Sequence, residues 1–169
     1  MKLNVFTGKN YEEVESEALE SLGLTINEVV IYKKSKKGIF KNQVELVVTP
    51  LTDILEFSKK YIKELFENIG INIDFESRIE NKQILIKMHS SDSPIIIGYN
   101  GKNLKALQVV IKGIIKNKFG AVPYISLDVG NYKDRQIKNL ERTARRIAKE
   151  VSKTKIPNED DYCKCYGTN

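Results

Sequence analysis

The fold is decided by the stretch Ser93-Pro94-Ile95-Ile96-Ile97-Gly98-Tyr99-Asn100-Gly101-Lys102-Asn103-Leu104. A short apolar run ends in a Gly-x-x-Gly turn, and a helix with apolar residues at helical spacing begins directly after it. Two glycines permit a tight turn and let another backbone come close. The unpaired N–H groups and the dipole at the start of the following helix favour an anion, and Lys102 adds a positive charge beside them. The turn is therefore suited to a sugar-phosphate backbone.

Gly-x-x-Gly also occurs as a plain connection between two helices, with Gly98 as a C-cap and Gly101 at the start of the next helix. The elements on either side decide between the two interpretations. Periodicity predicts a helix over 53–69, strands over 71–75 and 84–89, a short helix over 94–97, a helix after the turn and a strand over 124–129. The helix after the turn carries apolar residues at Leu104, Leu107, Val110, Ile111, Ile114 and Ile115.

This order of elements, αββααβ, resembles a KH domain of the type II arrangement, which we place at residues 51–130 with its Gly-x-x-Gly loop at 98–101. In that family the loop clamps about four nucleotides of single-stranded nucleic acid through their backbone. The resemblance implies RNA contacts in and around the loop, from Ile97, Gly98, Tyr99, Asn100, Gly101, Lys102 and Lys105.

Residues 1–50 are predicted to form a small βαββ module. A strand ends at Gly8, a helix runs over 11–22 after the N-cap Asn10, and strands follow over 29–33 and 43–49. The turn from Lys33 to Lys41 is rich in lysine. It is either a solvated loop or a contact surface for RNA or for an acidic patch of another protein.

Residues 131–154 are predicted to form one long basic helix, capped by Asn131 and stopped by Pro157, within a basic segment over 131–157 that is followed by a polar tail over 158–169. Acidic residues are scarce on this helix, so its cationic face favours contact with nucleic acid over a merely solvated surface. Arg142, Arg145 and Arg146 are the residues that we expect to make these contacts. The predicted fold class is therefore α+β.

The composition excludes several other classes of protein. The net charge of +6 and the pI of about 9.1 indicate an acidic partner. No apolar run approaches the roughly 20 residues of a membrane span, and the first residues lack the apolar region of a signal peptide, so we expect a cytoplasmic protein without membrane insertion. Cys163, Cys165 and the single histidine, His89, cannot complete a tetrahedral zinc site. No catalytic motif is present, and we expect no cofactor and no enzymatic activity.

The chain as a whole resembles the Jag (SpoIIIJ-associated) family of bacterial RNA-binding proteins. The resemblance rests on Phe6–Glu13 with Lys36–Phe40, on Ile96–Gln108 and on Ser126–Tyr132. Two departures accompany it: the Arg-x-x-x-His motif of the family's C-terminal domain is absent, and Tyr99-Asn100 stands where a basic pair is expected in the loop. The family's role implies regulation of cell elongation or envelope growth, with a smaller KH-domain protein or a second copy of the chain as a partner.

The sequence thus predicts a single-stranded RNA-binding regulatory protein. A protein-interaction adaptor, in which RNA contact is lost or incidental, is the alternative. An enzyme that uses the glycine turn for a nucleotide phosphate is disfavoured, because no Gly-Lys-Ser/Thr sequence accompanies the turn.

Overall fold

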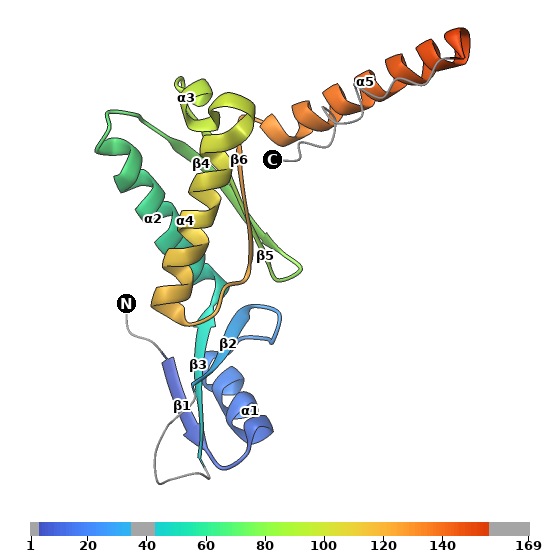
Figure 1. Cartoon of the computed structure of the whole chain (residues 1–169). Helices are drawn as coiled ribbons and strands as arrows, with labels where there is room; N and C mark the ends of the chain where they lie inside the picture. The colour runs from blue at the N-terminus through green and yellow to red at the C-terminus, as the bar shows by residue number, and fades with distance from the viewer. Residues whose placement is uncertain (1–3, 35–42, 156–169) are drawn as a thin grey trace. The chain divides into compact units, whose positions relative to one another are not determined.

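The computed structural model describes residues 4–34 and 43–155, which contain two three-stranded sheets and five α-helices (Figure 1). This mixture of helices and sheets confirms the α+β class. The chain divides into two compact units, Met1–Gly130 and Asn131–Asn169. Most of the predicted basic turn (residues 35–41), Pro157, the tail and both cysteines lie outside the described residues.

The first sheet has the strand order β1-β3-β2, with all its neighbours antiparallel. Helix α1 packs on one face of it, and Val14 and Ala18 of that helix join Val29, Leu46 and Val48 in a buried cluster. Asn10 precedes α1 in extended conformation, but its side chain donates to Glu13 Oε1 at 2.9 Å instead of capping a backbone N–H. The elements are β1 (Asn4–Gly8), α1 (Tyr11–Leu22), β2 (Val29–Lys34) and β3 (Val44–Pro50).

No linker separates the first sheet from the next helix. Strand β3 ends at Pro50, and α2 (Leu51–Glu67) begins at the following residue, with the N–H of Leu51 bonded to the carbonyl of Glu28 at 2.8 Å. A second link lies at Gly120, where a Cβ atom would stand 2.5 Å from Cδ1 of Tyr32. The ring of Tyr32, on β2, therefore packs against the backbone that follows α4.

The second sheet has the strand order β4-β5-β6, with β4 and β5 antiparallel and β5 and β6 parallel. A parallel pair needs a long crossover, and here the crossover consists of α3, the glycine loop and α4. The order helix, strand, strand, helix, loop, helix, strand predicted from the sequence is confirmed. The elements are β4 (Asp74–Glu80), β5 (Gln83–His89), α3 (Ser93–Ile97), the 3₁₀ turn η1 (Tyr99–Gly101), α4 (Lys102–Phe119) and β6 (Tyr124–Val129).

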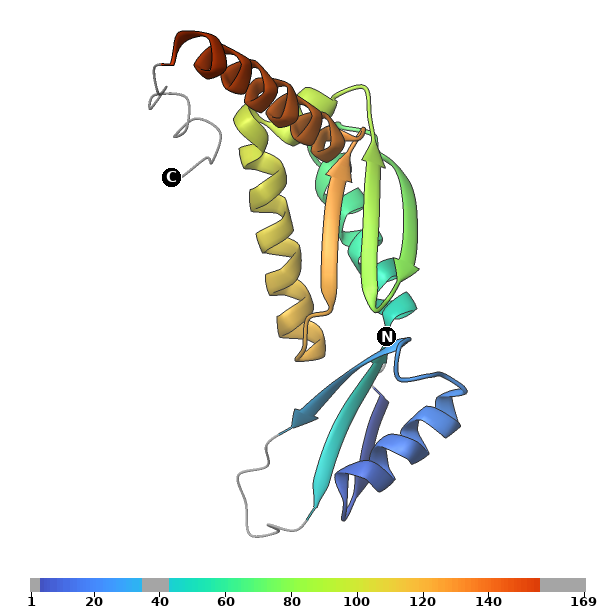
Figure 2. The ribbon, with the colours of Figure 1, turned by 90° about the vertical axis from the view of Figure 1, so that its right-hand side faces the viewer.

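Helices α2 and α4 lie side by side on one face of this sheet (Figure 2). Alternate residues of the two parallel strands point into the core between sheet and helices, since a strand repeats every two residues. Burial of these apolar groups is the main force that holds the crossover on the sheet. The core residues of β5 and β6 are Ile84, Ile86, Met88, Ile125, Leu127 and Val129, all with at most 1% of their surface exposed.

One prediction for these elements was wrong in detail. Strand β4 spans 74–80 and not 71–75, because its position is fixed by the tight turn at Asn81 and Lys82, both with positive φ, from which it pairs back along β5. Ile71 and Ile73 are buried but lie before the strand. On α4, Val110 is 46% exposed, while Phe119 is buried at the end of the helix with 4% exposed.

Helix α5 (Tyr132–Thr154) is the described part of the second unit. It follows Asn131, which takes a left-handed conformation with φ 61° and makes no side-chain cap. Its carbonyl accepts the N–H of Arg135 at 3.1 Å. The helix ends at Thr154, the residue predicted from the sequence, and Lys155 follows as a left-handed C-cap.

Candidate nucleic-acid interface

The glycine loop begins with a backbone conformation that requires glycine. Gly98 has φ 70° and ψ 177°, a region that residues with a Cβ essentially do not occupy. Its N–H bonds to the carbonyl of Pro94 at 2.9 Å and closes the last turn of α3. A Cβ at Gly98 would also lie 2.5 Å from Cγ of Asn103. Strain and lack of space therefore both select glycine here.

The second half of the loop turns left-handed and leads into α4. Asn100 (φ 51°, ψ 31°) and Gly101 (φ 76°, ψ 14°) both take this conformation, which asparagine and glycine tolerate better than other residues. The N–H of Gly101 bonds to the carbonyl of Gly98 at 3.2 Å. Gly101 is buried, whereas Tyr99 and Asn100 project at the surface.

Asn103 fixes the loop from the far side and is a residue that the sequence analysis missed. Its amide donates to the carbonyl of Ile95 at 2.9 Å and so links the first turn of α4 to α3. An asparagine two residues after the second glycine was the available signal, but its partner is eight residues earlier and cannot be read from spacing alone.

The N-terminus of α4 is open to an anion. Gly101 offers no side chain as a cap, and no acidic residue stands in the first turn. The first N–H groups of a helix have no partner within it, and the helix dipole places partial positive charge there. Lys102 and Lys105 are exposed beside this end. A phosphate placed here would meet backbone donors and two ammonium groups.

Apolar and aromatic groups lie next to these cations. Tyr99 is 78% exposed and Ile95 58% exposed, both unusually open for their type. The Lys102 ammonium lies 5.9 Å from the centre of the Tyr99 ring, at the outer limit of a cation–π contact. We define the loop surface as Ile95, Tyr99, Asn100, Lys102 and Lys105. It combines groups on which a base can stack with groups that hold a phosphate.

Ile97, predicted as a contact residue, is buried with 9% of its surface exposed. Ile96, its neighbour, is 2% exposed, so only Ile95 of the three isoleucines faces outward. Gly98 and Gly101 shape the loop through their backbones. The structure therefore brings together the predicted loop residues but assigns Ile97 to the core beneath them.

Arg142, Arg145 and Arg146 are all exposed on α5. Their spacing of three and four residues places them on one face of the helix. They belong to the second unit, and the loop surface belongs to the first.

The open face of the second sheet carries a charged cluster and no catalytic arrangement. His89 lies on β5, with Nε2 3.3 Å from Glu76 Oε1, and the Lys87 ammonium is 3.6 Å from Glu76 Oε2. The contact with His89, followed by the charge of Lys87, holds the pKa of Glu76 below its usual 4.5. Among the described residues, no group of three histidine, cysteine or carboxylate side chains could hold a metal ion.

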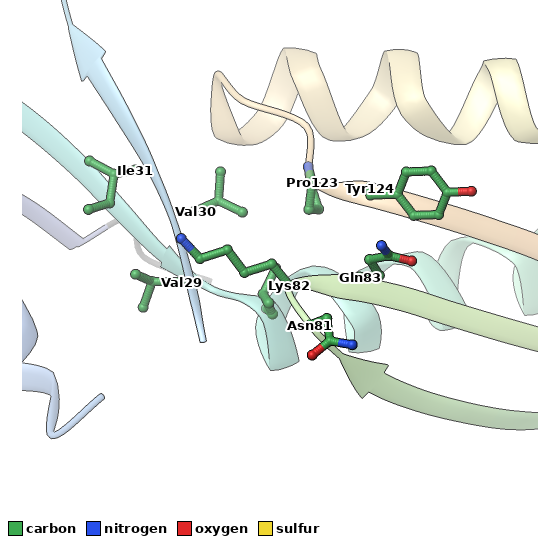
Figure 3. A pocket seen from close by; sticks show the side chains of 9 residues that line it. Val29, Val30, Ile31, Asn81, Lys82, Gln83, Pro123 and Tyr124 are labelled. Atoms are coloured by element: carbon green, nitrogen blue, oxygen red, sulfur yellow. The ribbon is translucent and has the colours of Figure 1, made fainter. Parts of the chain in front are cut away.

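A pocket of about 380 Å³ lies at the other end of β5, where the β4–β5 turn faces β2 (Figure 3). One wall consists of aliphatic side chains of β2, and the other carries Asn81, Lys82, Gln83 and Tyr124. None of its lining residues is acidic. No helix among the described residues is long and apolar enough to cross a membrane.

The family model and the relatives that match this chain carry the same KhpA/KhpB name. The family model of the KhpA/KhpB KH domain matches residues 56–126. "RNA-binding protein KhpB" of Clostridium symbiosum is 24% identical over 147 residues, which are 86% of this chain and 60% of that protein. The protein of the same name from Bacillus subtilis is 25% identical over 154 residues, 88% of this chain and 74% of its own.

A third relative, "RNA-binding protein KhpB" of Streptococcus pneumoniae strain D39, is 22% identical over 140 residues and is covered over 37% of its length. The chain thus spans between about one third and three quarters of these relatives. The matched domain contains the αββααβ order, the glycine loop and the parallel β5–β6 pair. The family-model match over residues 56–126 and the relatives named KhpB together support a KH protein of the Jag/KhpB type, the kind of protein that the sequence resembles.

Proposed function

We propose that this chain binds single-stranded RNA by holding its sugar-phosphate backbone on the loop surface. The observation that carries the proposal is the open N-terminus of α4 behind Gly98 and Gly101, with no side-chain cap and no acidic residue in its first turn. Its two lysines complement phosphate, while Tyr99 and Ile95 offer faces for one or two bases. The relatives are named RNA-binding proteins, which supports the same class of ligand.

The cationic face of α5 would add phosphate contacts through Arg142, Arg145 and Arg146. Such contacts carry no sequence information and raise affinity for any strand. Gly98, Gly101 and the buried Ile97 would act by shaping the loop. We place the N-terminal module at residues 1–50, the KH domain at 51–130, the basic helix segment at 131–157 and the polar tail at 158–169.

The family resemblance supports a cytoplasmic regulator of cell elongation or envelope growth, with a smaller KH-domain protein as a partner. No enzymatic step is proposed. An adaptor that binds only proteins is the competing function, and the experiment below distinguishes it.

The test is a titration of the whole chain with an unstructured single-stranded RNA and a duplex of the same sequence, each at two salt concentrations. We expect a preference for the single strand and weaker binding at higher salt. The variant Tyr99→Asp with Asn100→Asp should weaken binding by about 10-fold or more, since two carboxylates would oppose the phosphates.

Asn27→Asp with Gln43→Glu is the matched control, because both positions are exposed on the first sheet's module and the change in net charge is the same. It should leave affinity nearly unchanged. Equal affinity of the loop variant and the parent, with the fold intact by circular dichroism, would remove the loop from the site. No binding of the parent at low salt would favour the adaptor.

A further inference from the structure

The pocket between the β4–β5 turn and β2 combines an apolar wall with a cation (Figure 3). Its volume of about 380 Å³ lies near the lower end of the range for pockets that hold small molecules, about 300–1,000 Å³. In the described part of the chain, Lys82 is the charged residue of the lining. The other lining residues are apolar (Val29, Val30, Ile31, Leu51 and Pro123) or polar and uncharged (Asn81, Gln83 and Tyr124).

The backbone at Lys82 indicates that this position is kept for its side chain and not for the turn. Asn81 and Lys82 are the two central residues of the tight β4–β5 turn, with φ 49° and 61°. Such a turn prefers glycine at its second central position, because a Cβ atom is strained in the left-handed region. A lysine there costs stability, and strain of this kind is a reason to look for a function of the side chain.

The charge of Lys82 is available to an anion from solution. Figure 3 shows its side chain extended from the turn toward β2. Glu28 and Glu80, the carboxylates next in sequence to lining residues, are engaged elsewhere. Glu28 accepts hydrogen bonds from the N–H and the hydroxyl of Thr25, at 2.9 and 2.7 Å. Glu80 lies 3.5 Å from Nε of Arg78.

The edge of β2 adds backbone donors to this wall. Successive side chains of a strand point to opposite faces, so three consecutive residues border one cavity when the edge of the strand faces it. Residues 29–31 of β2 meet this condition. Strand β3 pairs with β2 on one side, and β2 is the last strand of the first sheet. An edge strand presents N–H groups that no neighbouring strand accepts, and these can donate to the same anionic group as Lys82.

We propose that this pocket binds a small organic anion, with its carboxylate or phosphate on Lys82 and its apolar body against Val30, Ile31 and Pro123. The proposal does not rest on RNA binding, because the pocket lies at the start of β5 and the loop surface follows the end of that strand. A strand of RNA would need several cations in a row, whereas the described lining supplies Lys82.

The test is an NMR titration of the isotope-labelled full chain with octanoate and with adenosine monophosphate. Octanoate joins a carboxylate to an aliphatic body, and adenosine monophosphate joins a phosphate to a planar one, so the two probes distinguish the kinds of ligand. At least one of them should shift the backbone amides of Val30, Ile31 and Lys82 and reach saturation. Its uncharged counterpart, octanol or adenosine, should bind at least about 10-fold more weakly, because the charge-assisted hydrogen bonds are missing.

Lys82→Gly separates the ligand site from the stability of the fold. Glycine removes the ammonium and also relieves the left-handed strain, so the variant should unfold at the same or a higher temperature. It should bind the probe about 10-fold more weakly or not at all. Lys155→Gly is the matched control, because Lys155 is an exposed lysine with φ 59° at the end of α5, in the second unit. It loses the same charge and the same strain, and its affinity for the probe should equal that of the parent.

No saturable shift of the pocket amides with either probe would overturn the proposal. Equal affinity of Lys82→Gly and the parent would do the same, and so would equal affinity for the charged probe and its uncharged counterpart. A single-stranded RNA that shifts the pocket amides in the parent but not in Lys82→Gly, where neither probe binds, would assign the pocket to nucleic acid instead.

Discussion

The side-chain amide of Asn103 donates a 2.9 Å hydrogen bond to the backbone carbonyl of Ile95 and thereby closes the glycine loop from behind. Asn103 stands in the first turn of α4 and Ile95 in α3, so the bond spans the loop. The same amide occupies the space beside Gly98 where a side chain would otherwise lie. Loop shape, the start of α4 and the exposure of Tyr99 therefore depend on one another.

Gly98→Ala should destabilise the first unit by about 2 kcal/mol, because alanine is strained at φ 70°, ψ 177° and would meet Asn103. Gly113→Ala, in the helix α4 that follows the loop, is the control, since a Cβ there meets nothing within 4 Å. That change should stabilise by about 0.5–1 kcal/mol through helix propensity. Urea unfolding measures both, and a neutral Gly98→Ala would show that the loop conformation is not required.

Asn103→Ala should cost about 1 kcal/mol by loss of its hydrogen bond. In that background Gly98→Ala should cost less than it does in the parent, because the clash with the amide is gone and only the backbone strain remains. A double-mutant cycle in urea measures this coupling. Asn117→Ala, at the exposed far end of α4, should show no coupling to Gly98→Ala. Strict additivity for Asn103 would contradict the predicted contact.

Replacing Arg142, Arg145 and Arg146 by glutamine should weaken RNA binding alike for all sequences and flatten its salt dependence. Each lost phosphate contact should reduce the slope of log affinity against log salt by about 0.7 for a single strand. Glutamine keeps helix propensity close to that of arginine. The control replaces Lys59, Lys60 and Lys63 of α2 by glutamine, which removes the same charge from another helix. Equal slopes in the arginine variant and the parent would mean that α5 makes no phosphate contact.

The carboxyl of Glu76 should titrate with a pKa below 4.5, because His89 contacts it and the Lys87 ammonium lies nearby. A carboxyl whose pKa is lower in the folded than in the unfolded state stabilises the fold above its unfolded pKa. That contribution is lost as the pH falls through the folded value. NMR titration of the side chain should show the pKa of Glu76 rising toward 4.5 in His89→Gln. Lys82→Gln, on the distant turn, should not move it, and an unmoved pKa in His89→Gln would exclude the histidine as the main cause.

Much of the KH domain follows from local pattern. Apolar residues at helical spacing locate α2 and α4, and strict alternation over 124–129 gives β6 with its bounds unchanged. The sequence also places the glycine loop at a helix start, because glycine pairs and an abrupt change of period are local signals. The bounds of strand β4 were predicted wrongly because its residues 76–80 are mostly polar. It exists as a strand through pairing with β5 and not through its own alternation.

The candidate site shows the same division. Residue type alone indicates a phosphate-binding turn at 98–101, and charge alone indicates a cationic face on α5. Only tertiary packing separates Ile95, which is 58% exposed, from Ile97, which is 9% exposed, because the depth of each depends on how α3 meets the core. The contact of Tyr32 with Gly120 and the bond of Asn103 to Ile95 are likewise set by chain segments that meet in space. The sequence by itself determined most of the elements and the place of the loop through spacing, whereas burial, loop shape, strand pairing and the bounds of β4 were decided by contacts that spacing does not encode.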